Sequence, residues 1–182
     1  MEKPPRLTPD RNLVLIGYRA SGKTSVGRAL AERLVRDFVD LDEVLVAEAG
    51  CDIAQLVAKE GWPGFRRREK ELVRRYALKG GQVLAPGGGV VLDPENVALL
   101  REHGVVIWIT APAAVLRERL QADAATAAQR PGLTGGDAAL EIDQVLAERE
   151  PLYRSAAHLV VDTAFCSVTE VAEEILRLLP DN

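Results

Sequence analysis

A glycine-rich segment near the N-terminus constrains this chain more than any other feature. Residues 17–24 read GYRASGKT and fit the pattern G-x-x-x-x-G-K-[ST] at every fixed position. The segment follows an apolar run at residues 12–17 and precedes helical periodicity from residue 22 to about residue 34, which is the context of a phosphate-binding loop. The backbone N–H groups of such a loop and the N-terminus of the following helix bind anions. The pattern therefore predicts binding of a nucleoside triphosphate.

Two side chains of this loop carry specific chemistry. Lys23 is placed to reach the β- and γ-phosphates, and the hydroxyl of Thr24 is placed to bind Mg²⁺. Contacts with the nucleotide, taken to be ATP, are expected from seven loop residues: Gly17, Ala20, Ser21, Gly22, Lys23, Thr24 and Ser25. The loop alone does not identify the reaction.

Apolar runs and helical segments alternate along the chain. Candidate strands lie at residues 12–17, 37–41, 81–86, 105–110 and 158–162. Candidate helices lie at residues 22–34, 43–49, 53–59, 65–78, 112–120 and 137–153, with one more opened by Asp93-Pro94 and another by a capping box of Ser167 and Glu170. This alternation predicts an α/β, three-layer P-loop fold with a central five-stranded parallel sheet and helices on both faces.

The length of 182 residues suits one domain over residues 1–182. Residues 1–11 contain three prolines and are expected to form a loose tail. Residues 121–136 interrupt the alternation with Ala, Thr and Gly, which is typical of a flexible lid or of a plain surface loop.

Composition excludes several classes of protein. The net charge is −4 with a pI near 5.3, so no basic surface for nucleic acid is indicated. Two cysteines are too few for a disulfide framework, and no apolar stretch approaches the length of a membrane span. We expect a cytoplasmic monomer with a small-molecule substrate and neither a nucleic-acid nor a membrane partner.

Asp40 and Asp42 lie two residues apart at the end of the second candidate strand. Period-two alternation would send both side chains to the same side of the strand, at the sheet edge where ligands of α/β proteins bind. One carboxylate could support the magnesium shell, and the other could accept a hydrogen bond from a substrate hydroxyl. The alternative is a solvated loop.

The ordered set of motifs resembles the shikimate kinase family over nearly the whole chain, from Asn12 to Leu179. The matching pieces are GYRASGKT, FVDLD, FRRRE, APGGG, QRPGL and REPLY. The resemblance implies phosphorylation of the 3-hydroxyl of shikimate by ATP, in aromatic amino acid biosynthesis.

For the acceptor, the resemblance implies that Asp42 holds the hydroxyls of shikimate, that Arg66 and Arg149 bind its carboxylate, and that the backbone of Gly87, Gly88 and Gly89 approaches it. The acceptor-binding segment would span residues 42–79. For the nucleotide, it implies that Asp40 assists Mg²⁺ with Thr24 and that Arg130, in a lid over residues 121–136, closes over the phosphates. Lys23, Asp42 and Arg130 would be the catalytic groups.

The residues themselves support part of this assignment. Arginine is suited to a bidentate grip on a planar carboxylate, and Glu69 lies three residues after Arg66 on a candidate helix, so it can orient the guanidinium. Alternatives stay open: a solvated helix face for residues 66–68, an ion pair of Arg149 with a neighbouring glutamate, and a plain connection at residues 87–89. His103 and His158 are interpreted as structural or surface residues.

Four positions depart from the family pattern. Ala20 stands where glycine is usual and would cost about 1–2 kcal/mol if the position needs a positive φ. Trp62-Pro63-Gly64 replaces a more polar stretch, and Ala85-Pro86 precedes the triple glycine where a hydroxyl residue is common. The loop at residues 163–166 lacks the basic residue often found near adenine.

Two other functions are compatible with the loop motif. One is another P-loop metabolite kinase, such as a gluconate or nucleoside monophosphate kinase, and the other is an ATP-sensing regulatory module. The two candidate arginines suit an acceptor with a carboxylate, and the sequence shows no pocket for the base of a nucleoside monophosphate. The retained acceptor residues argue against the sensor.

Overall fold

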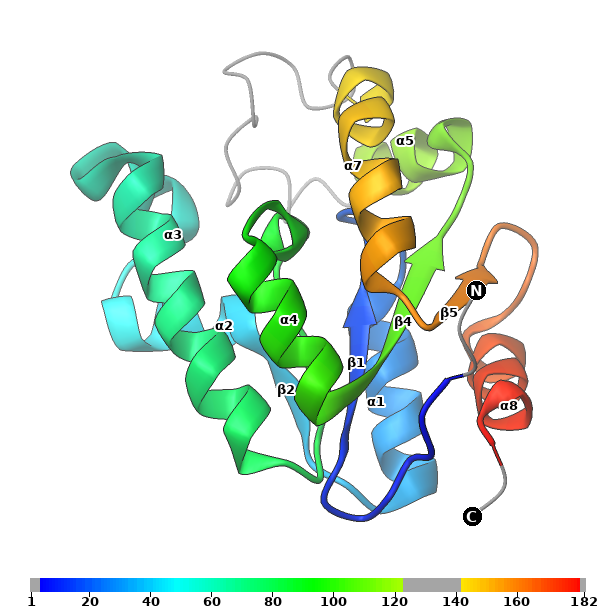
Figure 1. Cartoon of the computed structure of the whole chain (residues 1–182). Helices are drawn as coiled ribbons and strands as arrows, with labels where there is room; N and C mark the ends of the chain where they lie inside the picture. The colour runs from blue at the N-terminus through cyan, green and yellow to red at the C-terminus, as the bar shows by residue number, and fades with distance from the viewer. Residues whose placement is uncertain (1–3, 123–141, 181–182) are drawn as a thin grey trace.

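The computed structural model describes residues 4–122 and 142–180. Five strands form one sheet in the order β2-β3-β1-β4-β5, and every neighbouring pair is parallel. The strands are β1 (Asn12–Ile16), β2 (Phe38–Asp40), β3 (Val83–Ala85), β4 (Gly104–Thr110) and β5 (Leu159–Asp162). The predicted five-stranded parallel sheet is confirmed (Figure 1).

Helices and one short 3-10 turn connect these strands. They are α1 (Lys23–Leu34), α2 (Leu41–Ala49), α3 (Ile53–Lys79), η1 (Val90–Leu92), α4 (Pro94–His103), α5 (Ala113–Ala122), α7 (Ile142–Ala156) and α8 (Val168–Leu178). Helix α3 is broken at Gly61, whose φ of 71° and ψ of 171° are not helical. The two helices predicted at residues 53–59 and 65–78 are the two sides of this break.

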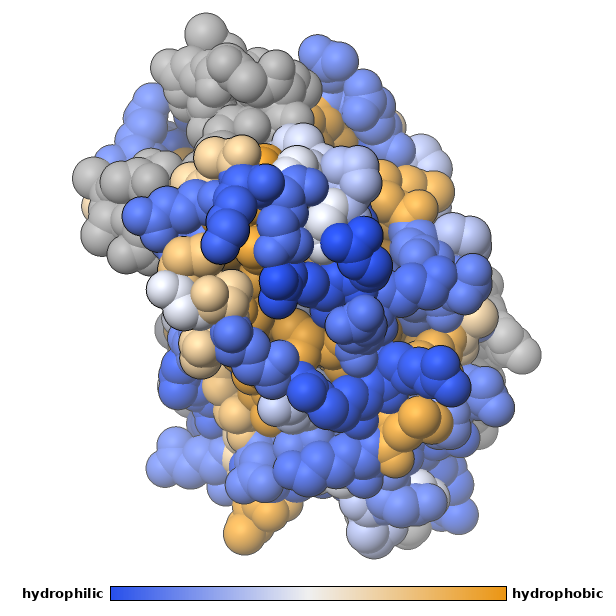
Figure 2. Space-filling model, turned by 90° about the vertical axis from the view of Figure 1, so that its left-hand side faces the viewer, coloured by the Kyte–Doolittle hydropathy of each residue, from blue (hydrophilic) through white to orange (hydrophobic). Residues whose placement is uncertain are grey.

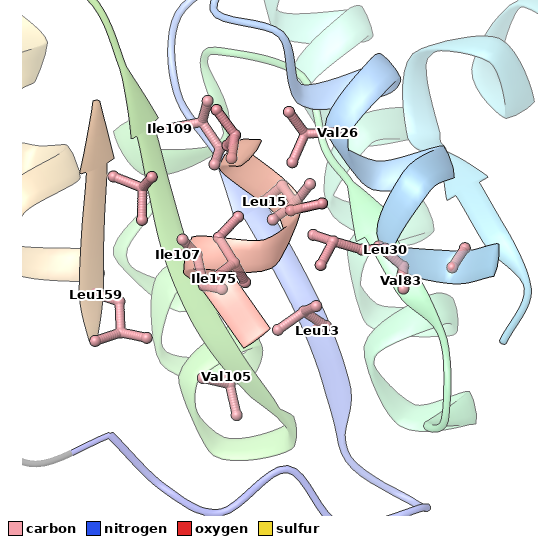
Figure 3. Close-up of a cluster of buried hydrophobic side chains, with 14 of the residues drawn as sticks. Leu13, Leu15, Val26, Leu30, Val83, Val105, Ile107, Ile109, Leu159 and Ile175 are labelled. Carbon is pink, nitrogen blue, oxygen red and sulfur yellow. The ribbon is translucent and has the colours of Figure 1, made fainter. Parts of the chain in front are cut away.

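The two faces of the sheet bury separate apolar clusters because successive side chains of a strand point to opposite sides. Leu13 and Leu15 of β1 pack with Leu30 of α1 and Ile175 of α8 on one face (Figure 3). Val14 and Ile16 of the same strand pack under α3, α4 and α7 on the other face. Helices therefore cover both faces, as the runs of apolar residues predicted.

Helix α3 carries its apolar side inward and leaves a polar outer side. Figure 2 shows this flank of the molecule, where hydrophilic residues predominate and hydrophobic surface is confined to scattered areas.

Within the described ranges, no helix combines the length and the apolar character that crossing a bilayer requires.

The expectation of a loose tail over residues 1–11 is wrong for its second half. Leu7 is buried and packs into the cluster of Leu13 and Leu15. Arg36 donates hydrogen bonds to the carbonyl oxygens of Thr8 at 2.9 Å and Arg11 at 2.6 Å. The prolines correctly predicted irregular backbone. The segment is nevertheless held in place, because Leu7 packs into the core and Arg36 binds its carbonyl oxygens.

The predicted strand at residues 37–41 is also too long. Asp40 ends β2 and caps α2, since its Oδ1 accepts from the backbone N–H groups of Asp42 at 3.0 Å and Glu43 at 3.4 Å. Asp42 is therefore helical, and strand alternation is the wrong reason for placing it beside Asp40. Of the helix predicted at residues 137–153, α7 covers the part from Ile142 and continues to Ala156, whereas residues 137–141 lie outside the described ranges.

Val35 ends α1 in a strained conformation that suggests a stabilising substitution. Its φ and ψ are both 52°, the left-handed region, and the residue is 93% exposed. A β-branched residue there is disfavoured by the clash of its Cβ with the following carbonyl. Val35→Gly should raise the free energy of unfolding by about 0.5–1 kcal/mol after the greater entropy of the unfolded glycine chain is counted.

Urea and thermal unfolding of the two proteins would measure this difference, which corresponds to a midpoint about 2 °C higher. Val35→Ala, which keeps the Cβ, is the control and should gain less. A Val35→Gly variant less stable than the unchanged protein would show that the valine makes a contribution other than backbone strain.

Candidate active site

The phosphate-binding loop joins β1 to α1 at the carboxyl end of the sheet. The ammonium of Lys23 donates hydrogen bonds to the carbonyl oxygens of Gly17 at 2.9 Å and Tyr18 at 3.0 Å, so it lies folded over the loop. The Thr24 hydroxyl donates to Oδ2 of Asp40 at 2.9 Å. Two oxygen groups suited to magnesium thus converge from α1 and from the end of β2.

A pocket of about 1530 Å³, partly open to solvent, surrounds this loop. It is lined by Ala20, Ser21, Gly22, Lys23, Thr24 and Ser25, which are six of the seven loop residues predicted to bind nucleotide. Asp40 and Asp42 lie in its wall, together with Pro86 of the Ala85-Pro86 departure. The structure therefore brings the predicted nucleotide and metal residues to one place.

Ala20 adopts a φ of 60° within this loop. The sequence predicted a free-energy cost for alanine if this position needs a positive φ. The structure shows that it does, in the left-handed region that glycine tolerates best. The loop therefore carries a strain of about 1–2 kcal/mol that a glycine would not.

Sequence reasoning missed Arg119. It lies on α5 and lines the same pocket, where its guanidinium donates to the Thr163 hydroxyl at 3.0 Å and to the Thr163 carbonyl at 2.7 Å. The loop at residues 163–166 lacks a basic residue of its own, but a helix distant in sequence supplies one. The sequence places Arg119 in the last turn of a candidate helix, but no local pattern predicts which loop its side chain contacts.

A second, smaller pocket of about 480 Å³ adjoins the first. Its lining comes from the phosphate-binding loop, the start of α2, both parts of α3, the triple glycine and α7, namely Tyr18, Arg19, Asp42, Ile53, Trp62, Phe65, Arg66, Glu69, Gly87, Gly88, Gly89 and Arg149. Every acceptor residue expected from the sequence is in this set. Segments more than 100 residues apart along the chain thus form one small chamber that combines charged groups with an aromatic wall.

Arg66 is held by a buried carboxylate. Its Nη1 donates to Oε2 of Glu69 at 2.5 Å, and the side chain of Glu69 is almost fully buried. The guanidinium also lies 5.1 Å from the ring centroid of Phe65 and 5.6 Å from that of Trp62. Trp62 therefore forms part of the pocket wall beside Arg66. The prediction that Glu69 pairs with Arg66 is confirmed.

The other two arginines of the run point elsewhere. Arg68 pairs with Glu60, with Nη2 to Oε1 at 2.7 Å, and Arg67 is exposed. The alternative of a solvated helix face therefore holds for Arg67, while Arg66 alone faces the pocket.

Arg149 and Tyr153 of α7 fix the triple glycine. Nη1 of Arg149 donates to the carbonyl of Gly88 at 3.3 Å, and the Tyr153 hydroxyl donates to the same oxygen. Burial raises the pKa of Tyr153 to about 12, so its hydroxyl keeps its proton at neutral pH. Arg149 is buried and faces the pocket, which excludes the alternative of an ordinary surface ion pair on α7.

Glycine at residues 87 and 89 leaves room for the ends of neighbouring charged side chains. A Cβ on Gly87 would lie 2.7 Å from Oδ1 of Asp42 and 3.0 Å from Oε1 of Glu69, and one on Gly89 would overlap the guanidinium of Arg66. These are positions of close approach, as three successive glycines predicted, and not a plain connection. Arg130, predicted to close over the phosphates, lies outside the described residues.

A phosphate-binding loop with a separate acceptor pocket beside it defines a P-loop kinase of small molecules. The family model for shikimate kinase matches residues 19–180. A shikimate kinase of Oleidesulfovibrio alaskensis is 50% identical over 92% of this chain and 96% of its own length, and a shikimate kinase 2 of Syntrophotalea carbinolica is 47% identical over 92% and 97%. This chain belongs to the shikimate kinase family and is an ATP-dependent kinase.

Solved structures agree with this assignment. A shikimate kinase from Acinetobacter baumannii in complex with shikimate superposes with a TM-score of 0.86 at 33% identity, covering 92% of each chain. A gluconokinase from Sinorhizobium meliloti reaches 0.54 at 21% identity, covering 96% of this chain and 93% of its own, and shares the fold alone.

The buried Glu69 predicts a pH-dependent difference in stability. Burial raises the pKa of Glu69 above its usual 4.5, with Arg66 opposing the shift. A carboxyl whose pKa is raised in the folded protein stabilises it below the unfolded pKa, and this contribution is lost as the pH rises through the folded pKa. Glu69→Gln has the shape of the protonated form and does not titrate.

The free energy of unfolding of Glu69→Gln should therefore increase relative to that of the unchanged protein as the pH rises from about 4 to 7. Urea denaturation at several pH values measures it, with the exposed Glu71→Gln as the matched control. A difference that shrinks with rising pH would mean that the pairing with Arg66 outweighs the burial of Glu69.

Proposed function

We propose that this protein transfers the γ-phosphoryl group of ATP to the 3-hydroxyl of shikimate, giving shikimate 3-phosphate and ADP, as a step of aromatic amino acid biosynthesis. One observation carries the proposal. Asp42 borders both the nucleotide pocket and the small chamber that holds Arg66 and Arg149. A carboxylate at that border can accept a hydrogen bond from a hydroxyl of the acceptor, while the two arginines bind the carboxylate of the same molecule.

The acceptor roles follow from charge and geometry. Arg66 and Arg149 would bind the carboxylate of shikimate, and each charged hydrogen bond contributes about 1.5–3 kcal/mol. Asp42 would accept a hydrogen bond from the reacting hydroxyl, while the backbone of residues 87–89 lines the opposite wall. Residues 42–79 would form the acceptor-binding segment.

Nucleotide binding would rest on the loop from Gly17 to Ser25. Lys23, folded over the loop carbonyls, would turn its ammonium to the β- and γ-phosphates. Thr24 and Asp40, already joined by a hydrogen bond, fit Mg²⁺ because both present oxygen atoms at the phosphate edge of the pocket. When bound, the ion would neutralise phosphate charge.

The transfer is in line and needs no covalent enzyme intermediate. The 3-oxygen of shikimate forms a bond to the γ-phosphorus as the bond from that phosphorus to the ADP oxygen breaks. Asp42 takes the hydroxyl proton, and Lys23 balances the negative charge of the leaving ADP. Arg130 would contribute from a lid over residues 121–136. A monomeric state and a cytoplasmic location remain predictions.

The function is tested by ADP release from MgATP with shikimate, quinate, gluconate and AMP offered separately. Turnover that depends on shikimate, at a kcat/KM at least about tenfold above the other acceptors, is the expected result. AMP lacks the carboxylate that the paired arginines would bind, whereas quinate and gluconate carry one and would be distinguished by the shape of the small chamber. Lys23→Ala, which lacks the phosphate-binding ammonium, supplies the background. Faster turnover of gluconate would keep the kinase activity and assign the chamber to a different acceptor. ATP binding without acceptor-stimulated turnover would favour an ATP-sensing module.

Arg66→Ala should raise the KM for shikimate by about 10- to 100-fold and lower kcat much less, because it removes a bond made to substrate and transition state alike. Steady-state kinetics at saturating MgATP separates the two constants. The exposed Arg67→Ala is the matched control, being next in sequence and outside both pockets. An unchanged KM for Arg66→Ala would show that Arg66 does not bind the acceptor.

A further inference from the structure

Arg19 occupies a place that the proposed mechanism does not use. It is the third residue of the phosphate-binding loop and lines both the nucleotide pocket and the acceptor chamber. Among the described residues that line these two pockets, Asp42 is the other one common to both. One anion and one cation therefore border the passage from nucleotide to acceptor.

The guanidinium of Arg19 is buried without a full set of partners. The residue is 8% exposed, and no described residue accepts a hydrogen bond from its Nη2. Its Cζ lies 5.5 Å from the ring centroid of Tyr18, within the range of a cation–π contact, and this contact satisfies none of the N–H donors. A buried charged group without hydrogen bonds is costly, so a ligand that supplies an acceptor there gains binding energy.

The neighbouring arginines differ from Arg19 in both respects. Arg66 is paired with Glu69 and Arg149 with the Gly88 carbonyl, and both line the acceptor chamber alone. They are placed to bind a group that stays in that chamber, which suits the acceptor carboxylate. Arg19 borders the two spaces between which a group must move.

The backbone around Arg19 is held against the acceptor side. A Cβ on Gly88 would lie 3.2 Å from the carbonyl oxygen of Gly17 and 3.6 Å from the backbone nitrogen of Arg19. The phosphate-binding loop and the triple glycine therefore pack directly against each other, and the side chain of Arg19 leaves the loop at this junction.

We propose that the Arg19 guanidinium binds the phosphoryl group during its transfer and on the phosphorylated product, and this rests on the proposed function. The transferred phosphoryl group is the one anion that must pass from the nucleotide pocket to the acceptor chamber. Arg19 forms no covalent bond. It donates to the phosphoryl oxygens while the bond to ADP breaks, the bond to the acceptor oxygen forms and Asp42 holds the proton.

The test compares Arg19→Met with the unchanged protein and with Arg67→Met, an exposed arginine outside both pockets. Steady-state kinetics gives kcat and the KM for shikimate, and calorimetry gives the dissociation constants of shikimate and shikimate 3-phosphate. We expect kcat to fall by about 10- to 100-fold and the affinity for shikimate 3-phosphate to fall by a similar factor. The affinity for shikimate should change by less than about threefold, since its carboxylate keeps both other arginines.

A purely structural role predicts a different pattern. The melting temperature of ligand-free Arg19→Met should equal or exceed that of the unchanged protein, because a buried and incompletely bonded charge is replaced by an apolar side chain. A lower melting temperature with parallel losses for both ligands would assign Arg19 to loop structure and overturn the proposal. So would an unchanged kcat. If the unchanged protein does not phosphorylate shikimate, the proposed function fails first, and that result is separate from any effect of Arg19.

Discussion

The contact between two glycine-containing turns at adjacent strand ends is the constraint on which the site depends. Strands β1 and β3 are neighbours in the sheet, with Leu13 opposite Val83. The phosphate-binding loop follows β1, and the triple glycine follows β3, so the two turns meet where Gly88 faces the backbone of Gly17 and Arg19. A Cβ on Gly88 would lie 3.2 Å from the Gly17 carbonyl oxygen, so one of the two turns would have to shift by a few tenths of an ångström to admit a side chain.

The second constraint is electrostatic. The acceptor chamber is lined by the guanidinium groups of Arg19, Arg66 and Arg149 and by the carboxylates of Asp42 and Glu69. Buried charges are tolerated when they are paired and hydrogen-bonded, which is the case for Arg66 with Glu69. The three guanidinium groups outnumber the two carboxylates by one, which fits the proposal that the chamber binds an acceptor with a single carboxylate. Helix α7 closes this arrangement through the hydroxyl of Tyr153, which stays protonated and holds the Gly88 carbonyl.

Two departures from the family pattern, at residues 62–64 and 163–166, are accommodated by the packing around them. Trp62 forms an edge contact with Phe65 and supports Arg66, so an aromatic wall replaces a polar approach to α3. Pro63 follows the break at Gly61, where the first turn of the second half of α3 needs no donor from its backbone nitrogen. Arg119 brings to the loop at residues 163–166 the positive charge that this loop lacks.

The sequence by itself determined the parallel α/β fold, the phosphate-binding loop, the capping boxes at Asp52 and Ser167, and residues that line the smaller pocket. These are local signals, since a motif, a period or a cap is read from residues a few positions apart. The tertiary structure alone decided that Leu7 is buried, that Asp40 ends a strand to cap a helix, that Arg119 faces a distant loop and that Arg19 borders both pockets. Each of these depends on strand order and on side chains brought together across the chain, and no local pattern encodes which distant residue will be the neighbour.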